Sequence, residues 1–364
     1  NYNNINNKFR EFKMKKTPFN FAYQLSKLWL GANLKQLTPK IEDHNKKYTG
    51  KKISLSTTFA ITFVCNFECA HCGADIDNSK AHLDIKTDKI LSLIKEMNEH
   101  GMLRVGFTGG EPLVRKGIDE IIKKSDDNDL MISLTTNGWF VKRYSEVLKK
   151  ISLLNISIDG TEETHDFIRR KKGSFAKAIE AVKIAKANNI PVLVNTTIMS
   201  ANIDNIPEMN KLMKELNVNW SLEAYVEHDV IKKWQQGTNL SRPTNELFKK
   251  VVEEIGDNKN IVNSNDYLKM ITKKKGAPKV CFAGIGYSVI SPTGELYPCF
   301  PAMVDPKFKG MDLKKMSFNK AFEEMPLYRT GCATCDVLCH MEVNSLYSFS
   351  PNAIKKAFKY LKKK

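Results

Sequence analysis

The alternation of predicted strands and helices along this 364-residue chain limits its fold more than any other feature. Apolar residues recur at helical spacing between short segments rich in β-branched residues. The predicted strands are 54–64, 103–107, 130–135, 153–158, 191–197 and 218–224. The predicted helices between and after them are 88–100, 116–125, 142–150, 175–188, 203–217 and 243–256, with Thr87 and Ser174 expected as N-caps.

A βα unit repeated about six times predicts a parallel sheet covered by helices. Six repeats are too few for a closed eight-stranded barrel. We therefore expect an α/β fold with a partial (β/α)6 TIM-like barrel. Chemistry in such a fold is expected where the strands end and the loops begin.

The alternation stops near residue 275, where the sequence becomes rich in Gly, Pro and Cys. This change predicts a small loop-rich C-terminal domain after the barrel. Apolar residues at helical spacing also predict one helix before the barrel, at 17–37, and one basic helix at 351–361. The expected parts are an N-terminal helical extension at 1–50, the barrel at 51–274, the small domain at 275–345 and the basic C-terminal helix at 346–364.

The chain carries 57 basic and 40 acidic residues, a net charge of +17. Solvated surface lysines explain most of this excess, although basic residues do gather at both ends of the chain. The sequence contains neither a signal-peptide core nor an apolar run long enough to span a membrane. We expect a cytoplasmic protein whose basic amphipathic ends allow peripheral contact with an anionic membrane, and we expect no nucleic-acid partner.

The eight cysteines fall into two groups, and none lies between residues 73 and 280. The early group is Cys65, Cys69 and Cys72, and the late group is Cys281, Cys299, Cys332, Cys335 and Cys339. The chain is not small and shows no secretory signal, so disulfides are not the expected use. Both groups are typical of metal or cluster ligands in a reducing compartment.

The early group forms a C-x3-C-x2-C motif that directly follows the first predicted strand. Three neighbouring thiolates can hold three irons of a 4Fe–4S cluster and leave the fourth iron open to a small molecule. A zinc site with His71 as the fourth ligand is the alternative, because structural zinc takes four protein ligands. The motif alone leaves both open.

Three further motifs follow the second, third and fourth predicted strands, in that order. They are Gly-Gly-Glu-Pro at 109–112, Thr-Thr-Asn-Gly at 135–138 and Ile-Ser-Ile-Asp-Gly at 156–160. Each one alone is compatible with an ordinary turn. Because the strands are expected to be parallel, all three should converge on the edge of the sheet that carries the cysteine motif.

Together these motifs resemble the radical S-adenosylmethionine (SAM) superfamily over about residues 55–230. The resemblance implies that Cys65, Cys69 and Cys72 bind a catalytic 4Fe–4S cluster whose open iron takes the amino and carboxylate groups of SAM. It also implies the SAM-binding residues, which are Gly109, Gly110 and Glu111 at the amino group, Asn137 and Ser157 near the ribose and methionine, and Arg169 at the carboxylate. His71 stands where the family often has Phe, Tyr or Trp.

The same resemblance implies the reaction. The reduced cluster donates one electron to SAM, which gives methionine and a 5′-deoxyadenosyl radical that abstracts a hydrogen from a substrate C–H bond. The cofactors perform the difficult step, and the protein supplies position and exclusion of solvent. A low-potential electron donor such as a flavodoxin or ferredoxin is an expected partner.

The late cysteine group resembles the SPASM/Twitch extension of radical SAM enzymes, and this would make 275–345 an auxiliary cluster domain. The full SPASM pattern has seven cysteines, and the late group has five, so one auxiliary 4Fe–4S cluster is expected. The favoured ligands are Cys281, Cys299, Cys332 and Cys335, with Cys335 plus Cys339 as the competing pair. A zinc site with four cysteine ligands is the alternative.

The resemblance favours peptide or protein modification, such as natural-product peptide maturation, because the extension is commonest among such enzymes. Radical modification of a lipid or another membrane-associated anionic molecule is the alternative suggested by the net charge and the basic ends. A step in a cofactor or tetrapyrrole pathway is a third hypothesis. A cluster-bearing protein without catalysis would require the strand-end motifs to be coincidental.

Overall fold

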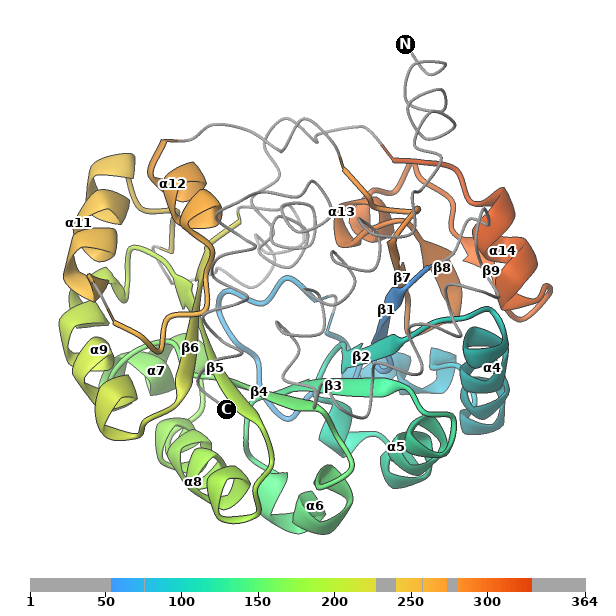
Figure 1. Ribbon diagram of the computed structural model, residues 1–364, viewed down its shortest axis with the longest axis horizontal. Coiled ribbons are helices and arrows are strands. Elements are labelled where there is room, and N and C mark those ends of the chain that lie inside the picture. The colour runs from blue at the N-terminus through green and yellow to red at the C-terminus, as the bar shows by residue number, and fades with distance from the viewer. Residues whose placement is uncertain (1–53, 75, 227–239, 257, 274–280, 329–364) are drawn as a thin grey trace, which may run out of the picture.

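The computed structural model describes residues 54–74, 76–226, 240–256, 258–273 and 281–328. Its strands form a curved wall, and its helices lie outside that wall (Figure 1). The six strands of the βα units are β1 (Ser56–Ala60), β2 (Arg104–Thr108), β3 (Met131–Thr136), β4 (Leu153–Ser157), β5 (Val192–Ile198) and β6 (Asn219–Ala224). All six correspond to predicted strands.

The sheet order β6-β5-β4-β3-β2-β1-β7-β8-β9 is linear, and every pair from β1 to β6 is parallel. β7 (Tyr287–Ile290) extends the parallel sheet beside β1. β8 (Glu295–Tyr297) and β9 (Met311–Asp312) then add antiparallel strands. Since β6 and β9 lie at opposite ends of this order, the described sheet is open, which confirms the predicted partial barrel.

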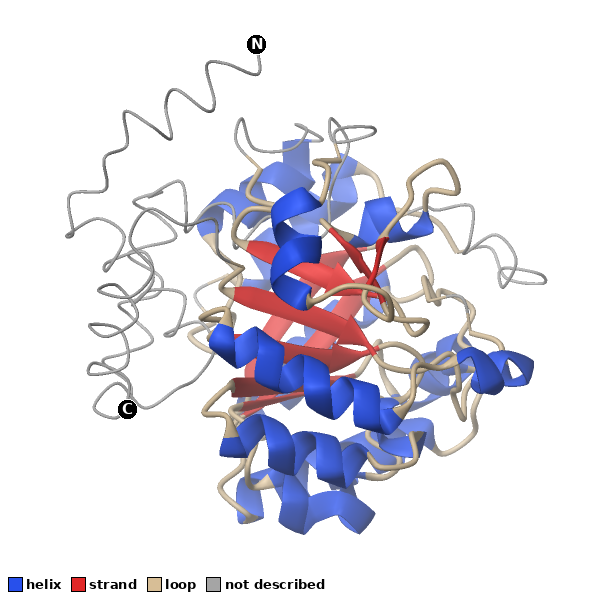
Figure 2. Cartoon of the chain, turned by 90° about the vertical axis from the view of Figure 1, so that its right-hand side faces the viewer, coloured by secondary structure: helices blue, strands red, loops and turns tan. Residues whose placement is uncertain are grey.

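Helices follow the strands and cover the outer face of the sheet (Figures 1 and 2). The long helices are α4 (Thr87–Glu99), α5 (Ile118–Asp127), α6 (Val141–Leu148), α7 (Glu162–Arg169), α8 (Ser174–Ala187), α9 (Ile206–Glu215), α11 (Asn245–Ile255) and α12 (Asn265–Lys273). The short ones are η1 (Asn78–Leu83), η2 (Pro112–Val114), η3 (Ile203–Asn205), α13 (Phe300–Val304) and α14 (Phe318–Glu324). The six predicted barrel helices are present, and the helices predicted at 17–37 and 351–361 lie outside the described residues.

Alternation along the strands separates an apolar face from a polar one. On β4, Leu154 and Ile156 are fully buried in the core beneath the helices, whereas Asn155 and Ser157 are only partly buried. Successive side chains of a strand point to opposite faces, so the second pair lies on the concave face. Asn155 meets Thr135 of the neighbouring β3 there, at 3.4 Å between Nδ2 and Oγ1. The barrel therefore offers a partly polar concave face.

The two predicted N-caps are wrong. Thr87 and Ser174 are the first residues of α4 and α8, and the N-cap positions belong to Lys86 and Gly173. At α8 the capping oxygen comes from the preceding helix. Asp166 of α7 accepts hydrogen bonds from the backbone N–H groups of Gly173 and Phe175 and from the Ser174 hydroxyl. This long side-chain cap ties α7 to α8.

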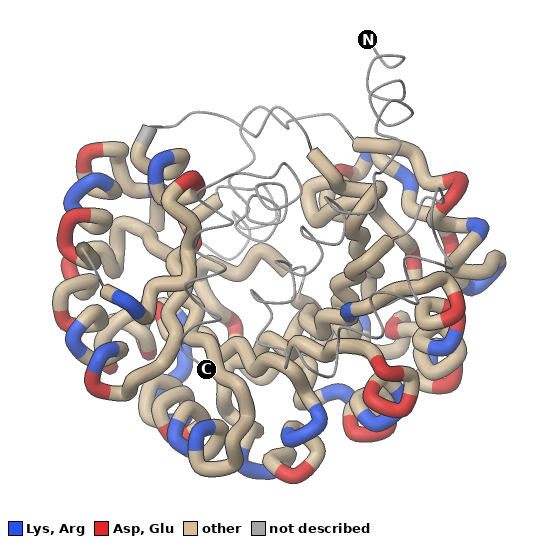
Figure 3. Tube along the Cα trace, in the orientation of Figure 1, with Lys and Arg blue, Asp and Glu red and all other residues tan. Residues whose placement is uncertain are grey.

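Charged residues of both signs are interspersed over the outer helices rather than gathered by sign (Figure 3). Pairs one helical turn apart, such as Lys123 with Asp119 and Lys211 with Glu215, are typical of solvated helix faces. None of the helices in the described ranges combines the length and apolar character that a membrane span requires.

Candidate active site

The cysteine motif lies in a loop that leaves the carboxyl end of β1 and is fixed on both sides. Asn78 accepts a hydrogen bond from the backbone N–H of Cys65 (3.0 Å), and Asp84 accepts one from Phe63 (3.0 Å). Further along the loop, the N–H of Ala70 donates to the carbonyl of Ile168 in α7 (2.9 Å). The loop is therefore held between η1 and α7.

The three cysteine sulfurs differ in their surroundings. Cys65 and Cys69 are buried, and Cys72 is partly buried. Burial raises the pKa of both Cys65 and Cys69, so a neutral thiol is favoured unless a cation compensates. Donors point at both sulfurs, from the N–H of Phe67 to Cys65 Sγ (3.4 Å) and from Arg169 Nη1 to Cys69 Sγ (3.9 Å). Buried sulfurs that meet N–H donors fit the thiolate ligands of an iron–sulfur cluster.

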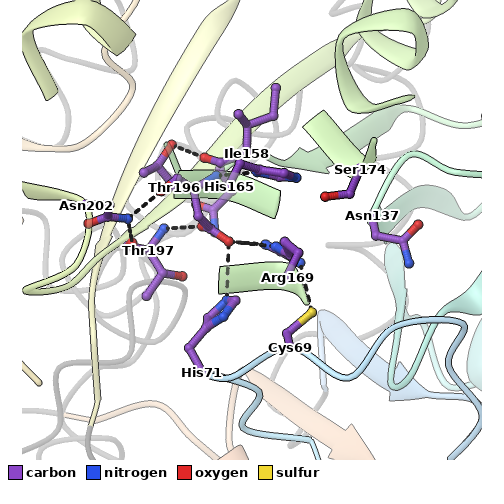
Figure 4. A network of polar contacts seen from close by, with 12 residues as sticks. Cys69, His71, Asn137, Ile158, His165, Arg169, Ser174, Thr196, Thr197 and Asn202 are labelled. Carbon is purple, nitrogen blue, oxygen red and sulfur yellow. Dashed lines mark hydrogen bonds and ion pairs between the residues drawn. The ribbon is translucent and has the colours of Figure 1, made fainter. Parts of the chain in front are cut away.

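His71, the fourth ligand of the zinc alternative, contacts Asp159. Its Nε2 lies 3.4 Å from Oδ2 of Asp159 (Figure 4), and burial lowers its pKa to about 4. In the described part of the chain, no three His, Cys, Asp or Glu side chains are placed to hold one metal ion.

The Gly109–Gly110 pair brings the end of β2 against the cysteine loop. The N–H of Gly110 donates to the Thr62 carbonyl (2.9 Å), and the N–H of Glu111 donates to the Val64 carbonyl (2.9 Å). A Cβ at Gly110 would lie 2.0 Å from the Val64 carbonyl oxygen, and Gly109 has a φ of +124°. Only glycine permits this backbone approach next to the first cysteine.

We expect Gly110→Ala to lose most of the iron bound by the early cysteine group, because the methyl group must displace the backbone that carries Cys65. Iron content and the electron paramagnetic resonance (EPR) signal of the reconstituted protein measure this loss. Gly173→Ala is the matched control, since Gly173 also has a positive φ, +78°, but a Cβ there meets no atom within 4 Å. The control should cost about 1–2 kcal/mol of stability and keep its iron. Full iron in Gly110→Ala would contradict this role of the glycine pair.

Glu111 links the ends of β2 and β3. Its Oε1 accepts hydrogen bonds from Leu113 N–H (3.0 Å) and the Thr136 hydroxyl (2.8 Å), and its Oε2 accepts one from Asn137 N–H (2.8 Å). Burial raises the pKa of Glu111 to about 7, although these hydrogen bonds oppose the rise. Asn137 in turn donates from Nδ2 to Asn66 Oδ1 (2.9 Å), next to Cys65. The two strand-end motifs and the cysteine loop therefore form one connected site.

Arg169, at the end of α7, pairs with Asp159, which follows β4. Its Nε lies 2.7 Å and its Nη2 2.5 Å from Asp159 Oδ2 (Figure 4). Burial alone would raise the pKa of Asp159, but Arg169 and His71 hold it below its ordinary value. Burial together with the Arg169 charge lowers the pKa of His165 to about 4, and its neutral ring accepts a hydrogen bond from Asp159 N–H at Nδ1 (3.0 Å).

Asp159 and His165 are site residues that the sequence analysis missed. Asp159 is followed by Gly160, and an Asp-Gly pair is typical of a turn. Two features could have identified Asp159. It follows a parallel strand close to Ser157, and the expected site includes an arginine that needs an acidic partner. His165 carries no such signal, because its partner is a backbone N–H.

The structure brings most of the predicted site residues together. Hydrogen bonds join the end of β1 and the cysteine loop to Gly110, Glu111, Asn137 and Arg169, and Gly109 directly precedes Gly110. Ser157 is the last residue of β4, on the concave side, opposite Asn195 of β5. In the late group, Cys281 and Cys299 share a small apolar cluster with Tyr287, whose hydroxyl lies 3.7 Å from Cys281 Sγ. The remaining three, Cys332, Cys335 and Cys339, lie outside the described residues.

Residues 59–216 match the model of the radical SAM superfamily. The AdoMet-dependent heme synthase of Methanosarcina barkeri is 24% identical over 74% of this chain and 82% of its own length. The PqqA peptide cyclase of Granulibacter bethesdensis is 26% identical over 66% of each chain. The antilisterial bacteriocin subtilosin biosynthesis protein AlbA of Bacillus subtilis is 27% identical over 67% of this chain, which spans only 54% of that protein.

Two solved structures share the fold. SuiB of Streptococcus suis, bound to S-adenosylmethionine, has a TM-score of 0.64 and 15% identity over 88% of this chain and 80% of its own. Native anSMEcpe with bound AdoMet and Cp18Cys peptide has a TM-score of 0.59 and 17% identity over 85% and 97% of the two chains. At this level of identity the likeness concerns the fold alone.

Proposed function

Because this chain belongs to the radical SAM superfamily through residues 59–216, we propose that it is an enzyme that modifies a peptide or protein substrate by abstracting a hydrogen atom. The family implies a 4Fe–4S cluster and SAM as cofactors. The observation that carries the proposal is the buried C-x3-C-x2-C loop, packed against the Gly-Gly-Glu-Pro segment and against Arg169. When bound and reduced, the cluster supplies the electron that cleaves SAM.

The residues of the chain have separate tasks in this proposal. Cys65, Cys69 and Cys72 hold three irons and leave the fourth to SAM. Gly109, Gly110 and Glu111 lie at the SAM amino group, with Asn137 and Ser157 near the ribose and methionine. Arg169 binds the SAM carboxylate. Its contacts with Asp159 use Nε and Nη2, the side edge of the guanidinium, and leave a further N–H on Nη2 for the SAM carboxylate.

Two kinds of observation support a peptide substrate. One is the set of similar proteins, which includes the PqqA peptide cyclase and the subtilosin biosynthesis protein AlbA. The structural neighbour SuiB was also solved bound to its precursor peptide SuiA. The other is the concave face, where Thr135, Asn155 and Asn195 offer hydroxyl and amide groups that suit the donors and acceptors of a peptide backbone.

A step in haem or tetrapyrrole synthesis is the second candidate. The specific observation is the similarity to the AdoMet-dependent heme synthase, which this chain matches over 82% of that protein's length. A low-potential donor such as flavodoxin or ferredoxin, a cytoplasmic location and peripheral contact of the basic ends with an anionic membrane are part of the proposal. Contact with a membrane would make a lipid a further candidate substrate. The basic ends on which this alternative depends lie outside the described residues.

Anaerobic turnover separates the two main candidates. The dithionite-reduced protein is incubated with SAM and either short peptides encoded beside its gene or iron-coproporphyrin III, and the products are analysed by mass spectrometry. We expect a peptide to change mass and to stimulate 5′-deoxyadenosine formation. Stimulation by the porphyrin alone, with a product derived from it, would replace peptide modification by the tetrapyrrole function.

We further propose one auxiliary 4Fe–4S cluster in a SPASM/Twitch-like domain at 275–345, after a barrel at 51–274. The ligands are Cys281, Cys299 and two of the three later cysteines, with Cys332 and Cys335 favoured. The shared apolar surroundings of Cys281 and Cys299 support this proposal. The flanking parts of the chain are the N-terminal extension at 1–50 and the basic helix at 346–364.

Iron analysis of a triple variant tests the auxiliary cluster. With Cys65, Cys69 and Cys72 replaced by alanine, we expect about four irons and a 4Fe–4S EPR signal to remain. Adding Cys281→Ala and Cys299→Ala should then remove the remaining iron, because two of the four ligands are gone. A triple variant that binds zinc and no iron would make this domain a structural zinc module.

A further inference from the structure

We propose that Asp159 is a positioning residue, which holds the Arg169 guanidinium against the cysteine loop so that it meets both Cys69 and the carboxylate of SAM. This inference rests on the proposed SAM site and deepens it. Asp159 is fully buried in the β4–α7 loop, and four ring or guanidinium nitrogens, from Arg169, His71 and His165, contact its carboxylate or its backbone N–H.

The hydrogen-bond geometry of Arg169 carries the argument. An arginine has five N–H donors in one plane. The contacts with Asp159 and Cys69 use one hydrogen on each of Nε, Nη2 and Nη1. These contacts leave one hydrogen on Nη1 and one on Nη2, and the one on Nη2 lies at the end edge of the guanidinium. Since Asp159 takes the side edge, it fixes the direction in which the end edge points.

Asp159 is itself held in place by β5 and the loop that follows it. The N–H of Thr197 donates to Oδ1 (3.0 Å), and Asn202 Nδ2 donates to the Asp159 carbonyl (2.7 Å) and to the Thr197 carbonyl (2.7 Å). Asn202 is fixed in turn, because its Oδ1 accepts from Met199 N–H (2.9 Å). The orientation of Oδ2 is therefore set by the fold rather than by Arg169.

The same oxygen reaches the cysteine loop at a second point. His71 Nε2 lies 3.4 Å from Oδ2, and His71 stands between Cys69 and Cys72 in the chain. The Asp159 carboxylate thus contacts both the Arg169 guanidinium, which donates to Cys69, and the His71 ring, which precedes Cys72 in the chain. A buried ion pair is often replaceable by apolar residues without loss of stability. Stability alone therefore does not explain the Asp159–Arg169 pair. Its contact with Cys69, a proposed cluster ligand, points to a role at the cluster.

Two consequences follow for the loaded enzyme. Without Asp159 the guanidinium is no longer oriented, and SAM should bind more weakly. The hydrogen bond to Cys69 Sγ should also be lost, and hydrogen bonds to the sulfurs are among the factors that set a cluster's reduction potential. Removing a donor makes reduction harder, so the midpoint potential should become more negative.

The test compares Asp159→Asn with the wild-type enzyme after anaerobic reconstitution. We expect unchanged iron content, SAM affinity at least about tenfold weaker, loss of the SAM-dependent change in the EPR spectrum and a more negative potential. Asp166→Asn is the matched control, because Asp166 is a carboxylate of α7, the helix that carries Arg169, and its own contacts cap α8. It should lower thermal stability and leave the SAM affinity and the spectrum as in the wild type.

A double variant covers the case in which Asp159→Asn leaves an unpaired buried arginine and does not fold. Asp159→Asn combined with Arg169→Gln removes both charges. If Asp159 acts through Arg169, the double variant should bind SAM no more weakly than Arg169→Gln alone. Unchanged affinity and spectrum in Asp159→Asn, or a double variant that binds SAM more weakly than Arg169→Gln alone, would overturn the inference. A wild-type enzyme that does not bind SAM would instead overturn the proposed function.

Discussion

Replacement of Cys65, Cys69 and Cys72 together by alanine is expected to abolish 5′-deoxyadenosine formation and to remove about four irons per chain. The physical reason is that these three sulfurs are the only protein ligands proposed for the catalytic cluster, and one 4Fe–4S cluster contains four irons. Iron analysis and chromatography of the dithionite-reduced protein with SAM measure both effects.

The matched control for this variant is Cys281→Ala with Cys299→Ala, which leaves the early cysteine group intact. It should keep the catalytic cluster and its SAM-dependent EPR change. Continued cleavage of SAM by the triple variant under dithionite would show that the catalytic cluster lies elsewhere.

Arg169→Ala is expected to weaken SAM binding at least about tenfold, because a charge-assisted contact contributes about 1.5–3 kcal/mol. It should also lower the free energy of unfolding by about 3–5 kcal/mol, since the buried Asp159 carboxylate loses its partner. Equilibrium dialysis with SAM and urea unfolding measure the two changes.

Arg170→Ala is the control for position, because Arg170 is the next residue and its side chain is exposed. It should bind SAM as the wild type does and keep its iron. Equal SAM affinity in Arg169→Ala and the wild type would remove Arg169 from the proposed site.

The barrel was predictable because its strands and helices carry local signals. β-branched strands and helices with one apolar face repeat six times, and the structure places each of them in the predicted order. β7 was missed because its four residues, Tyr287–Ile290, stand in a segment rich in Gly and Pro, and its pairing with β1 joins positions far apart in the sequence. α7 was missed because its eight residues are mostly polar and include only two buried ones, His165 and Ile168.

The parts of the candidate site that were predictable are those whose residues lie close together in the sequence. The cysteine spacing and the paired glycines are such motifs, and the structure explains the glycines by the contact of Gly110 with Val64. Asp159 was not predictable from its Asp-Gly sequence, because its partners Arg169, His71 and Thr197 come from three other segments of the fold. The predicted cap at Ser174 failed for a related reason, since the capping oxygen belongs to Asp166 in the preceding helix.

The most direct test of the central claim is the amount of 5′-deoxyadenosine that the iron-loaded wild-type protein forms from SAM under anaerobic dithionite. The account predicts that 5′-deoxyadenosine and methionine appear together, and that neither appears with the triple variant of Cys65, Cys69 and Cys72. A wild-type protein that carries its full iron and binds SAM, yet forms no 5′-deoxyadenosine, would contradict the claim that this chain is a radical SAM enzyme.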